Sequence, residues 1–159
     1  MRLTAAIMLA LLSGCASNNV VNVDGAGKWK YATDINGVKG MKMAALPSEG
    51  AMVGGVISVV RMPPEAREVD LIETKVMVEG ESRIVFAAQF PKVGECQPML
   101  NFNGDDYSPE VTDAEGVCRY VIDDARATHI AERMLEPGTV KVNGVSFETA
   151  GFHRLWQML

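Results

Sequence analysis

The sequence predicts a mainly β fold, an antiparallel β-sandwich or partly open barrel with one α-helix at about residues 123–136 and a short C-terminal helix. Three observations lead to this prediction. Apolar and polar residues alternate in several short runs, turn signals separate these runs, and one long segment has the spacing of an amphipathic helix. At 159 residues, the chain is long enough for one domain with its own core.

The strand predictions depend on alternation, because every second residue of a strand lies on the same face of a sheet. Residues 41–45, 72–78 and 84–90 alternate in this way, and the most apolar run, residues 52–60, is typical of a buried strand. Gly80 stands between two glutamates, so we expect a turn there that pairs the second run with the third as a hairpin.

Turn residues divide the remaining strands. Prolines at 63–64 interrupt the apolar run, so residues 62–67 are predicted to be a connection. The Asn-Gly pairs at 36–37 and 143–144 supply the two positive-φ residues of a type I′ hairpin turn. Residues 94–102 and 117–122 are expected to be strands on either side of a polar surface loop at 103–116.

One segment predicts a helix clearly. Asp123 or Asp124 is expected to cap its first turn, and the Pro-Gly pair at 137–138 ends it. Its apolar stripe consists of Ala127, Ile130, Ala131 and Met134. The short C-terminal helix would have on one side Phe152, Leu155, Trp156 and Leu159.

The N-terminus has the pattern of a signal peptide over residues 1–14: basic Arg2, an apolar stretch, and two small residues before Cys15. The apolar stretch of about ten residues is roughly half the length of a membrane-spanning helix. Residues 12–15, Leu-Ser-Gly-Cys, resemble the lipobox of bacterial lipoproteins. The alternative is an ordinary secretory leader whose first mature residue is Cys.

The lipobox resemblance implies cleavage before Cys15, a diacylglyceryl group on its thiol and an N-acyl chain, such as palmitate, on its new amine. Ala16 stands where inner-membrane retention usually needs Asp, so the resemblance implies a lipid anchor in the outer membrane, facing the periplasm. Residues 15–27 would form a flexible tether, and residues 28–159 a single β-rich domain.

Charge and cysteine content narrow the possible functions. Of 15 basic residues, processing removes Arg2 and leaves 14 against 20 acidic ones, so nucleic acid is not an expected partner. In an oxidising compartment, Cys96 and Cys118 are expected to form a disulfide, worth about 3 kcal/mol in the chain-entropy model. A redox-active pair is the alternative, although catalytic dithiols usually lie two residues apart.

No residue pattern points to catalysis, so the chain is not predicted to be an enzyme. His129 and His153 have no evident second ligand or orienting carboxylate, and Ser146 lacks the second glycine of a nucleophile elbow. Acids crowd residues 101–115, so a carboxylate-pair enzyme is an alternative there, beside the simpler interpretation of a solvated turn.

Two metal hypotheses remain. Asp105 and Asp106 suggest calcium, although their spacing matches no EF-hand loop. Met41 and Met43 share a predicted strand face and suggest copper, although methionine also fills cores without any metal. No other cofactor is expected.

The C-terminal half resembles the small β-sandwich proteins of the invasion-associated locus B type. The resemblance lies in the order of a Cys-bearing strand, an Asn/Asp loop, a second Cys, a helix, a hairpin and residues 147–152 before an apolar end. The resemblance implies a role in the cell envelope, and it does not imply any enzymatic reaction. We therefore expect a non-catalytic envelope lipoprotein that binds or assembles with a protein partner. The alternatives are small-ligand, copper or calcium binding, or an enzyme using the 101–115 loop.

Overall fold

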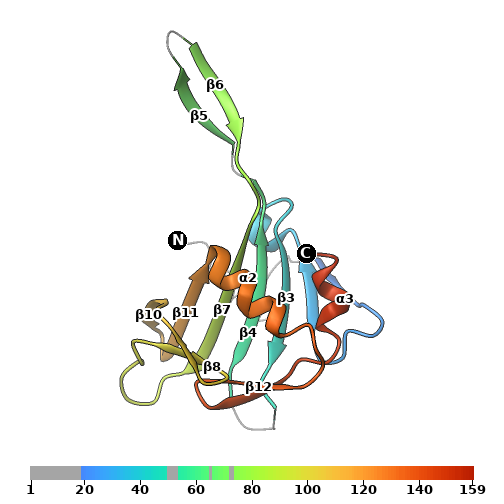
Figure 1. The fold of residues 1–159 in the computed structure, drawn as a ribbon, viewed down its shortest axis with the longest axis vertical. Coiled ribbons are helices and arrows are strands. Elements are labelled where there is room, and N and C mark those ends of the chain that lie inside the picture. The colour runs from blue at the N-terminus through green and yellow to red at the C-terminus, as the bar shows by residue number, and fades with distance from the viewer. Residues whose placement is uncertain (1–18, 50–53, 65, 72–73) are drawn as a thin grey trace.

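The computed structural model describes residues 19–49, 54–64, 66–71 and 74–159 (Figure 1). The predicted signal peptide, residues 1–14, and the lipidation site Cys15 lie outside these ranges. Within them, no helix is long and apolar enough to cross a membrane.

Two antiparallel sheets confirm the mainly β prediction, and they form an open arrangement rather than a closed barrel. The larger sheet has seven strands in the order β1 (Asn19–Val21), β2 (Lys30–Thr33), β3 (Lys42–Pro47), β4 (Val56–Met62), β7 (Arg83–Pro91), β11 (Val117–Asp123) and β10 (Glu110–Ala114). The smaller sheet has four, in the order β13 (Val145–Glu148), β12 (Thr139–Val142), β8 (Leu100–Phe102) and β9 (Asp105–Tyr107).

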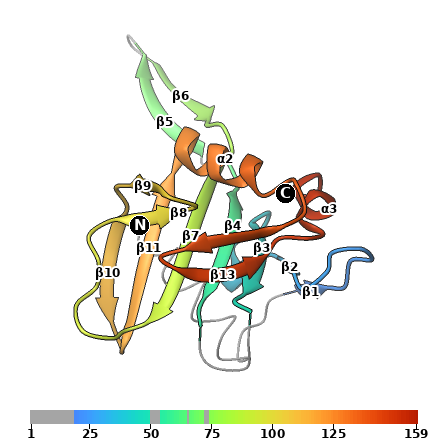
Figure 2. The same cartoon turned by 60° about the horizontal axis from the view of Figure 1, so that its bottom comes forward.

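The main core fills the space between one face of the larger sheet and a second layer (Figure 2). This layer consists of the smaller sheet with the helices α2 (Asp124–Arg133) and α3 (Phe152–Trp156). Aromatic rings join the layers: the Phe86 and Phe102 ring centroids are 6.1 Å apart, and those of Phe90 and Phe147 are 6.3 Å apart. Such edge-to-face pairs stabilise beyond the area they bury.

A smaller apolar cluster lies on the other face of the larger sheet. The connection from β2 to β3 folds over this face through a 3-10 helix, η1 (Ile35–Gly37). Met41 and Met43 are 0% and 1% exposed and belong to this cluster with Ile35. Core packing therefore explains why Met41 and Met43, the residues that suggested copper binding, share a strand face.

The helix predictions are largely confirmed. The predicted stripe of α2 is fully buried, because those residues face the main core. The helix ends at Arg133, three residues earlier than predicted. Asp123 at its N-cap makes no side-chain capping bond, and the side chain of Asp124, the other predicted cap, lies outside the described part of the structure. Asn143 and Gly144 have φ of 49° and 80°, as the predicted turn between β12 and β13 requires.

The predicted hairpin between residues 72–78 and 84–90 was wrong. Instead, β7 pairs with β4 and β11, and a separate antiparallel ribbon of β5 (Ala66–Leu71) and β6 (Thr74–Glu79) projects from the body (Figures 1 and 2). The β4–β7 pairing ends at Met62 and Arg83, directly before and after this excursion. Alternation marks a strand but does not identify its partner.

Three local predictions also need correction. Of the strand predicted at 94–102, only β8 forms, so Cys96 lies outside any strand, and the predicted loop at 103–116 contains β9 and β10. The Asn-Gly pair at 36–37 belongs to η1 in a longer connection, not to a two-residue turn. The predicted tether at 15–27 contains β1, and Ala26 within it is buried.

Gly151 offers a test of how the N-terminal segment packs on the C-terminal helix. A Cβ at Gly151 would lie 2.3 Å from the carbonyl carbon of Ala26, and its φ is +95°. We expect Gly151→Ala to lower the free energy of unfolding by about 3 kcal/mol, measured by chemical denaturation.

Gly94→Ala is the matched control, because Gly94 also has positive φ (+72°) but has no atom within 4 Å of an added Cβ. It should cost about 1 kcal/mol, the conformational penalty alone. Equal losses at the two positions would contradict the close packing of residues 25–26 on α3.

Candidate functional site

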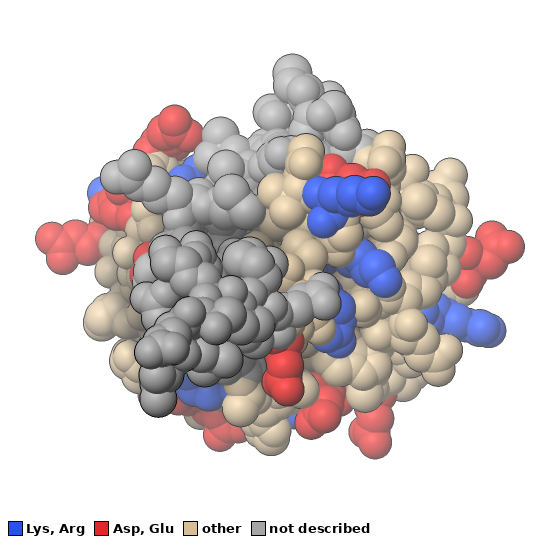
Figure 3. Space-filling view, turned by 90° about the horizontal axis from the view of Figure 1, so that it is seen from above, with Lys and Arg blue, Asp and Glu red and all other residues tan. Residues whose placement is uncertain are grey.

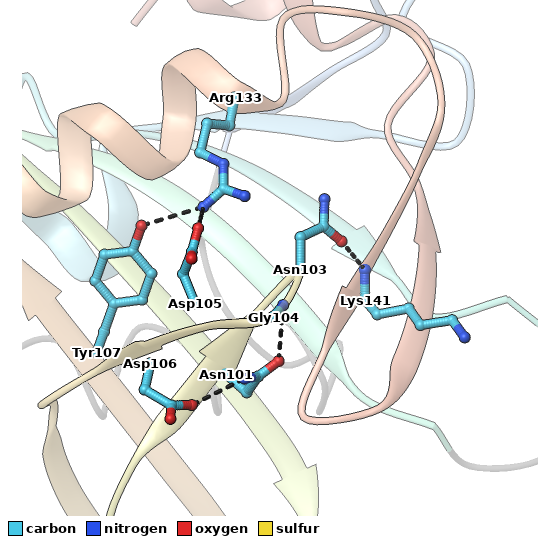
Figure 4. A network of polar contacts seen from close by, with 8 residues as sticks. All are labelled: Asn101, Asn103, Gly104, Asp105, Asp106, Tyr107, Arg133 and Lys141. Carbon is cyan, nitrogen blue, oxygen red and sulfur yellow. Dashed lines mark hydrogen bonds and ion pairs between the residues drawn. The ribbon is translucent and has the colours of Figure 1, made fainter.

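The acidic segment predicted as a functional loop is a hairpin of β8 and β9 beside the C-terminal end of α2 (Figure 4). Asn103 and Gly104 form its turn with φ of 49° and 93°. An Asn-Gly pair at this turn reverses the chain, so β8 and β9 pair from Leu100 opposite Tyr107 to Phe102 opposite Asp105.

Asp105 is bound to α2 by an ion pair. Its Oδ2 lies 2.7 Å from Nη1 of Arg133, which also donates to the hydroxyl of Tyr107 at 3.3 Å. The same guanidinium lies 4.9 Å from the centre of the Phe102 ring. The Arg133 side chain is 26% exposed and Asp105 is 66% exposed, so the arginine is the more enclosed partner and holds the hairpin against the helix.

Asparagine side chains link this hairpin to the β12–β13 hairpin (Figure 4). Asn101 donates to Asp106 Oδ1 at 2.8 Å, and its Oδ1 accepts from the Gly104 amide at 3.1 Å. Asn103 Oδ1 accepts from the backbone amide of Lys141 at 2.7 Å. Asn143 Oδ1 likewise accepts from the amide of Asn101 at 2.8 Å. Three of these bonds satisfy backbone amides, those of Asn101, Gly104 and Lys141, with side-chain oxygens.

The acids of residues 101–115 do not converge on one point. Asp113 on β10 pairs with Lys92 at 2.6 Å, and Glu115 lies 3.7 Å from the Arg119 guanidinium. Among the described residues, no group of three or more His, Cys, Asp or Glu is arranged to hold a metal ion. Asp105 and Asp106, the calcium candidates, are engaged by Arg133 and Asn101.

The other candidate residues lie apart from this network. His129 on α2 and His153 on α3 are exposed and belong to different helices. Ser146 lies on β13, where its carbonyl oxygen accepts from the Glu49 amide at 3.0 Å. The structure therefore does not bring the predicted histidines and serine together as a catalytic set.

Cys96 and Cys118 form the expected disulfide, with their Cα atoms 5.6 Å apart. The bond attaches the irregular segment before β8 to β11, where Cys118 is 5% exposed. Nearby, burial raises the pKa of the Tyr120 hydroxyl, and a hydrogen bond with the Gln97 backbone partly opposes this rise.

A groove beside the disulfide was not predicted from the sequence. It comprises adjoining hollows of about 310 and 470 Å³, and both are lined by Gly54, Phe90 and Pro91. A Cβ at Gly55 would lie 2.5 Å from the Phe90 ring, so this glycine allows the ring and the backbone to approach. In the sequence, the feature that could have indicated this groove was the pair of glycines within the apolar run at 52–60.

Comparison with known proteins adds no relative: no protein-family model, curated protein or solved structure matches the chain.

The ion pair between Arg133 and Asp105 yields a test of the structural role of this network. We expect Asp105→Asn to lower the free energy of unfolding by about 0.5 kcal/mol, because the pair is partly exposed. Arg133→Met should cost about 1.5 kcal/mol, since it also removes the contacts with Tyr107 and Phe102. Chemical denaturation measures both values.

Glu132→Gln, one residue earlier on the exposed side of α2, is the control for loss of charge and should change stability by less than about 0.5 kcal/mol. A calcium-induced rise in melting temperature that Asp105→Asn abolishes would contradict the structural interpretation and favour a calcium site.

Proposed function

We propose that this chain is an envelope lipoprotein, held in the outer membrane by lipid on Cys15, whose β domain binds a protein partner in the periplasm without catalysing a reaction. The main support for this proposal is the N-terminal pattern. A basic residue and a short apolar stretch are followed by the lipobox-like residues 12–15, which end at Cys15. Two or more acyl chains on one residue give stable anchoring.

The disulfide supports export to an oxidising compartment. Disulfides persist in the periplasm and are rare in the cytosol. Cys96 and Cys118 have a Cα separation of 5.6 Å, within the usual range for a disulfide, and Cys118 is buried in the main core.

The contacts of the acidic residues favour binding over catalysis. Asp105, Asp106 and Asp113 are each held by a side chain outside their own strand: Arg133 of α2, Asn101 of β8 and Lys92, which follows β7. A general acid or base needs a carboxyl group that faces a substrate, with its protonation tuned to the reaction. These three contacts instead stabilise the surface on which a partner would dock.

The edge of β10 is the route we propose for partner binding. Within the described chain, β10 is the last strand of the larger sheet, and it pairs only with β11. Its outer backbone groups can accept an extended segment of a partner as an additional strand. The exposed acid Glu110 on this strand would favour a partner strand with basic residues.

A small apolar ligand is the second candidate, and the groove beside the disulfide favours it. Val93 at its rim is 90% exposed, and Phe90 and Val145 line its wall. Ligand sites are commonly concave and mostly apolar.

The lipid anchor has a direct test. Intact-mass analysis of the native protein should show cleavage before Cys15 and a mass gain equal to a diacylglyceryl group with an N-acyl chain. Cys15→Ala should lose this gain and leave the membrane fraction, while alkylation finds no free thiol at Cys96 or Cys118. A native protein without lipid would refute the proposal.

The binding edge can be tested with a photo-crosslinking residue introduced at Glu110 in cells. We expect a discrete crosslinked protein, and in the purified complex the β10 amides should exchange hydrogen about tenfold more slowly. Lys141 is the control, because it is exposed but lies on β12, an inner strand of the smaller sheet. Equal crosslinking from both positions, or unchanged exchange in β10, would exclude strand addition at this edge.

A further inference from the structure

A hollow of about 500 Å³ opens at the end of the larger sheet where β4 ends and β7 begins. Figure 3 looks onto this end of the molecule, and Lys and Arg side chains gather near the middle of the face that it shows. The disulfide and its groove lie toward the other end of β7, where Phe90 pairs with Cys118. The hollow is therefore separate from that groove, and its size suits a small molecule.

The described walls of this hollow come from four elements of the fold. The strands β4 and β7 contribute Arg61 and Ile84, and Ile84 is buried at 6% exposure. The helix α2 contributes Ala125 and Thr128, which are three residues apart and therefore lie on one face of the helix. The helix α3 contributes Trp156. Polar and apolar groups thus converge from different elements, as they do in many ligand sites.

Arg61 occupies a position where the pattern of β4 predicts an apolar side chain. Successive residues of a strand alternate between faces, so Ile57, Val59 and Arg61 share the face toward the main core. Arg61 also pairs with Ile84 across β4 and β7. A long side chain can bury its methylene groups beside such a neighbour and still place its charge at the end of the sheet. Here Nη1 of Arg61 donates to Ser82 Oγ at 2.9 Å, and Ser82 is exposed.

The described side chains at this hollow leave one positive charge without a partner. Arg61 and Arg83 both line the hollow, and among the described residues neither forms an ion pair with a carboxylate. By contrast, Arg119 and Arg133 each pair with one. The exposed acid Glu81 also lines the hollow. Two arginines and one glutamate give a net charge of +1, which favours a ligand with a single negative charge.

The polar groups of the hollow are mainly hydrogen-bond donors. A guanidinium group has five N–H donors and no acceptor, and the bond with Ser82 uses one donor of Arg61. Arg83 adds a second guanidinium, and Thr128 adds a hydroxyl group. The planar fork of an arginine matches the two oxygens of a carboxylate, which accept hydrogen bonds in pairs. The donor set and the net charge together favour a carboxylate.

Trp156 gives the hollow a flat apolar wall. Its ring packs against Phe152, with the ring centroids 5.9 Å apart, so the core of the domain holds the indole in place. Trp156 is half-buried, whereas Trp29 is buried and donates its indole N–H to the carbonyl oxygen of Thr149 at 3.2 Å. The accessible part of the Trp156 ring is available to a second flat group, since aromatic rings pack well against one another.

We propose that this hollow is a binding site for a small carboxylate that carries a ring or another flat apolar group. Arg61 and Arg83 bind the carboxylate, and Trp156 contacts the ring. The site adds a small-molecule ligand to a domain whose proposed partner binds at the edge of β10, and it does not depend on the lipid anchor.

Nuclear magnetic resonance tests this site through the two tryptophans. The purified, isotope-labelled full-length protein is titrated with phenylacetate while the two indole N–H signals are followed. Three related compounds separate the contributions: acetate lacks the ring, phenylacetamide lacks the charge, and phenyl phosphate carries more than one charge. Trp156→Phe identifies the signal of the residue in the hollow, and buried Trp29 serves as the internal control.

We expect phenylacetate to shift the Trp156 signal to saturation and to leave the Trp29 signal unchanged. Acetate and phenylacetamide should each bind about tenfold more weakly, because each lacks one of the two contacts. Arg61→Gln should weaken phenylacetate binding about tenfold. Arg83→Gln should weaken it about threefold, because Arg83 is exposed and its contact is screened by water.

Arg154→Gln is the matched control, because Arg154 is an exposed arginine on the same helix as Trp156 and is not among the residues that line the hollow. It should change the affinity by less than about twofold. Equal weakening by Arg61→Gln and Arg154→Gln would show attraction by net charge alone and would overturn the proposal. If Arg61→Gln fails to fold, Arg61→Lys keeps the charge without the planar fork and should weaken binding about threefold.

The titration of the unmodified protein decides the question without any variant. Absence of a saturable shift at Trp156, or equal shifts of both indole signals, would overturn the site. Equal affinity for phenylacetamide and phenylacetate would overturn the role of the arginines. Tighter binding of phenyl phosphate than of phenylacetate would overturn the assignment to a carboxylate.

Discussion

The rest of the structure depends on β7, the strand with neighbours on every side. It pairs with β4 along one edge and with β11 along the other. Its inner face carries Phe86 and Phe90, whose rings contact Phe102 of β8 and Phe147 of β13. One strand thus connects both halves of the larger sheet with the second layer. A cavity in this strand would be costly, because each large ring fills space shared by several elements.

The polar contacts act at the periphery of this frame. Asn101, Asn103 and Asn143 hold two hairpins together, and Arg133 binds one of them to α2. Each contact joins elements that the core alone would position only approximately. Four of the acids in residues 101–115, Asp105, Asp106, Asp113 and Glu115, therefore have structural partners, and the binding surface we propose lies at the open edge of β10.

The proposed lipid anchor would give the domain a polarity. Lipid on Cys15 would lie near the end of the larger sheet where β1 begins, and the disulfide between Cys96 and Cys118 lies toward the other end of β7. The open edge of β10 runs between these ends. An anchored domain oriented in this way would present the edge and the groove to the periplasm, where an extended partner can reach them.

Local patterns in the chain were enough to predict the features that depend on neighbouring residues. These are the mainly β class, the turn at Asn143 and Gly144, the buried stripe of α2, and the single possible pairing of Cys96 with Cys118 once Cys15 is assigned to lipid. The pairing of strands and the contacts between distant polar groups became known from the fold. β6 pairs with β5 and not with β7, and Asp105 meets an arginine 28 residues away. Alternation and charge are local properties of a chain, whereas strand partners and ion pairs depend on which distant segments pack together, because burial is shared by the whole core.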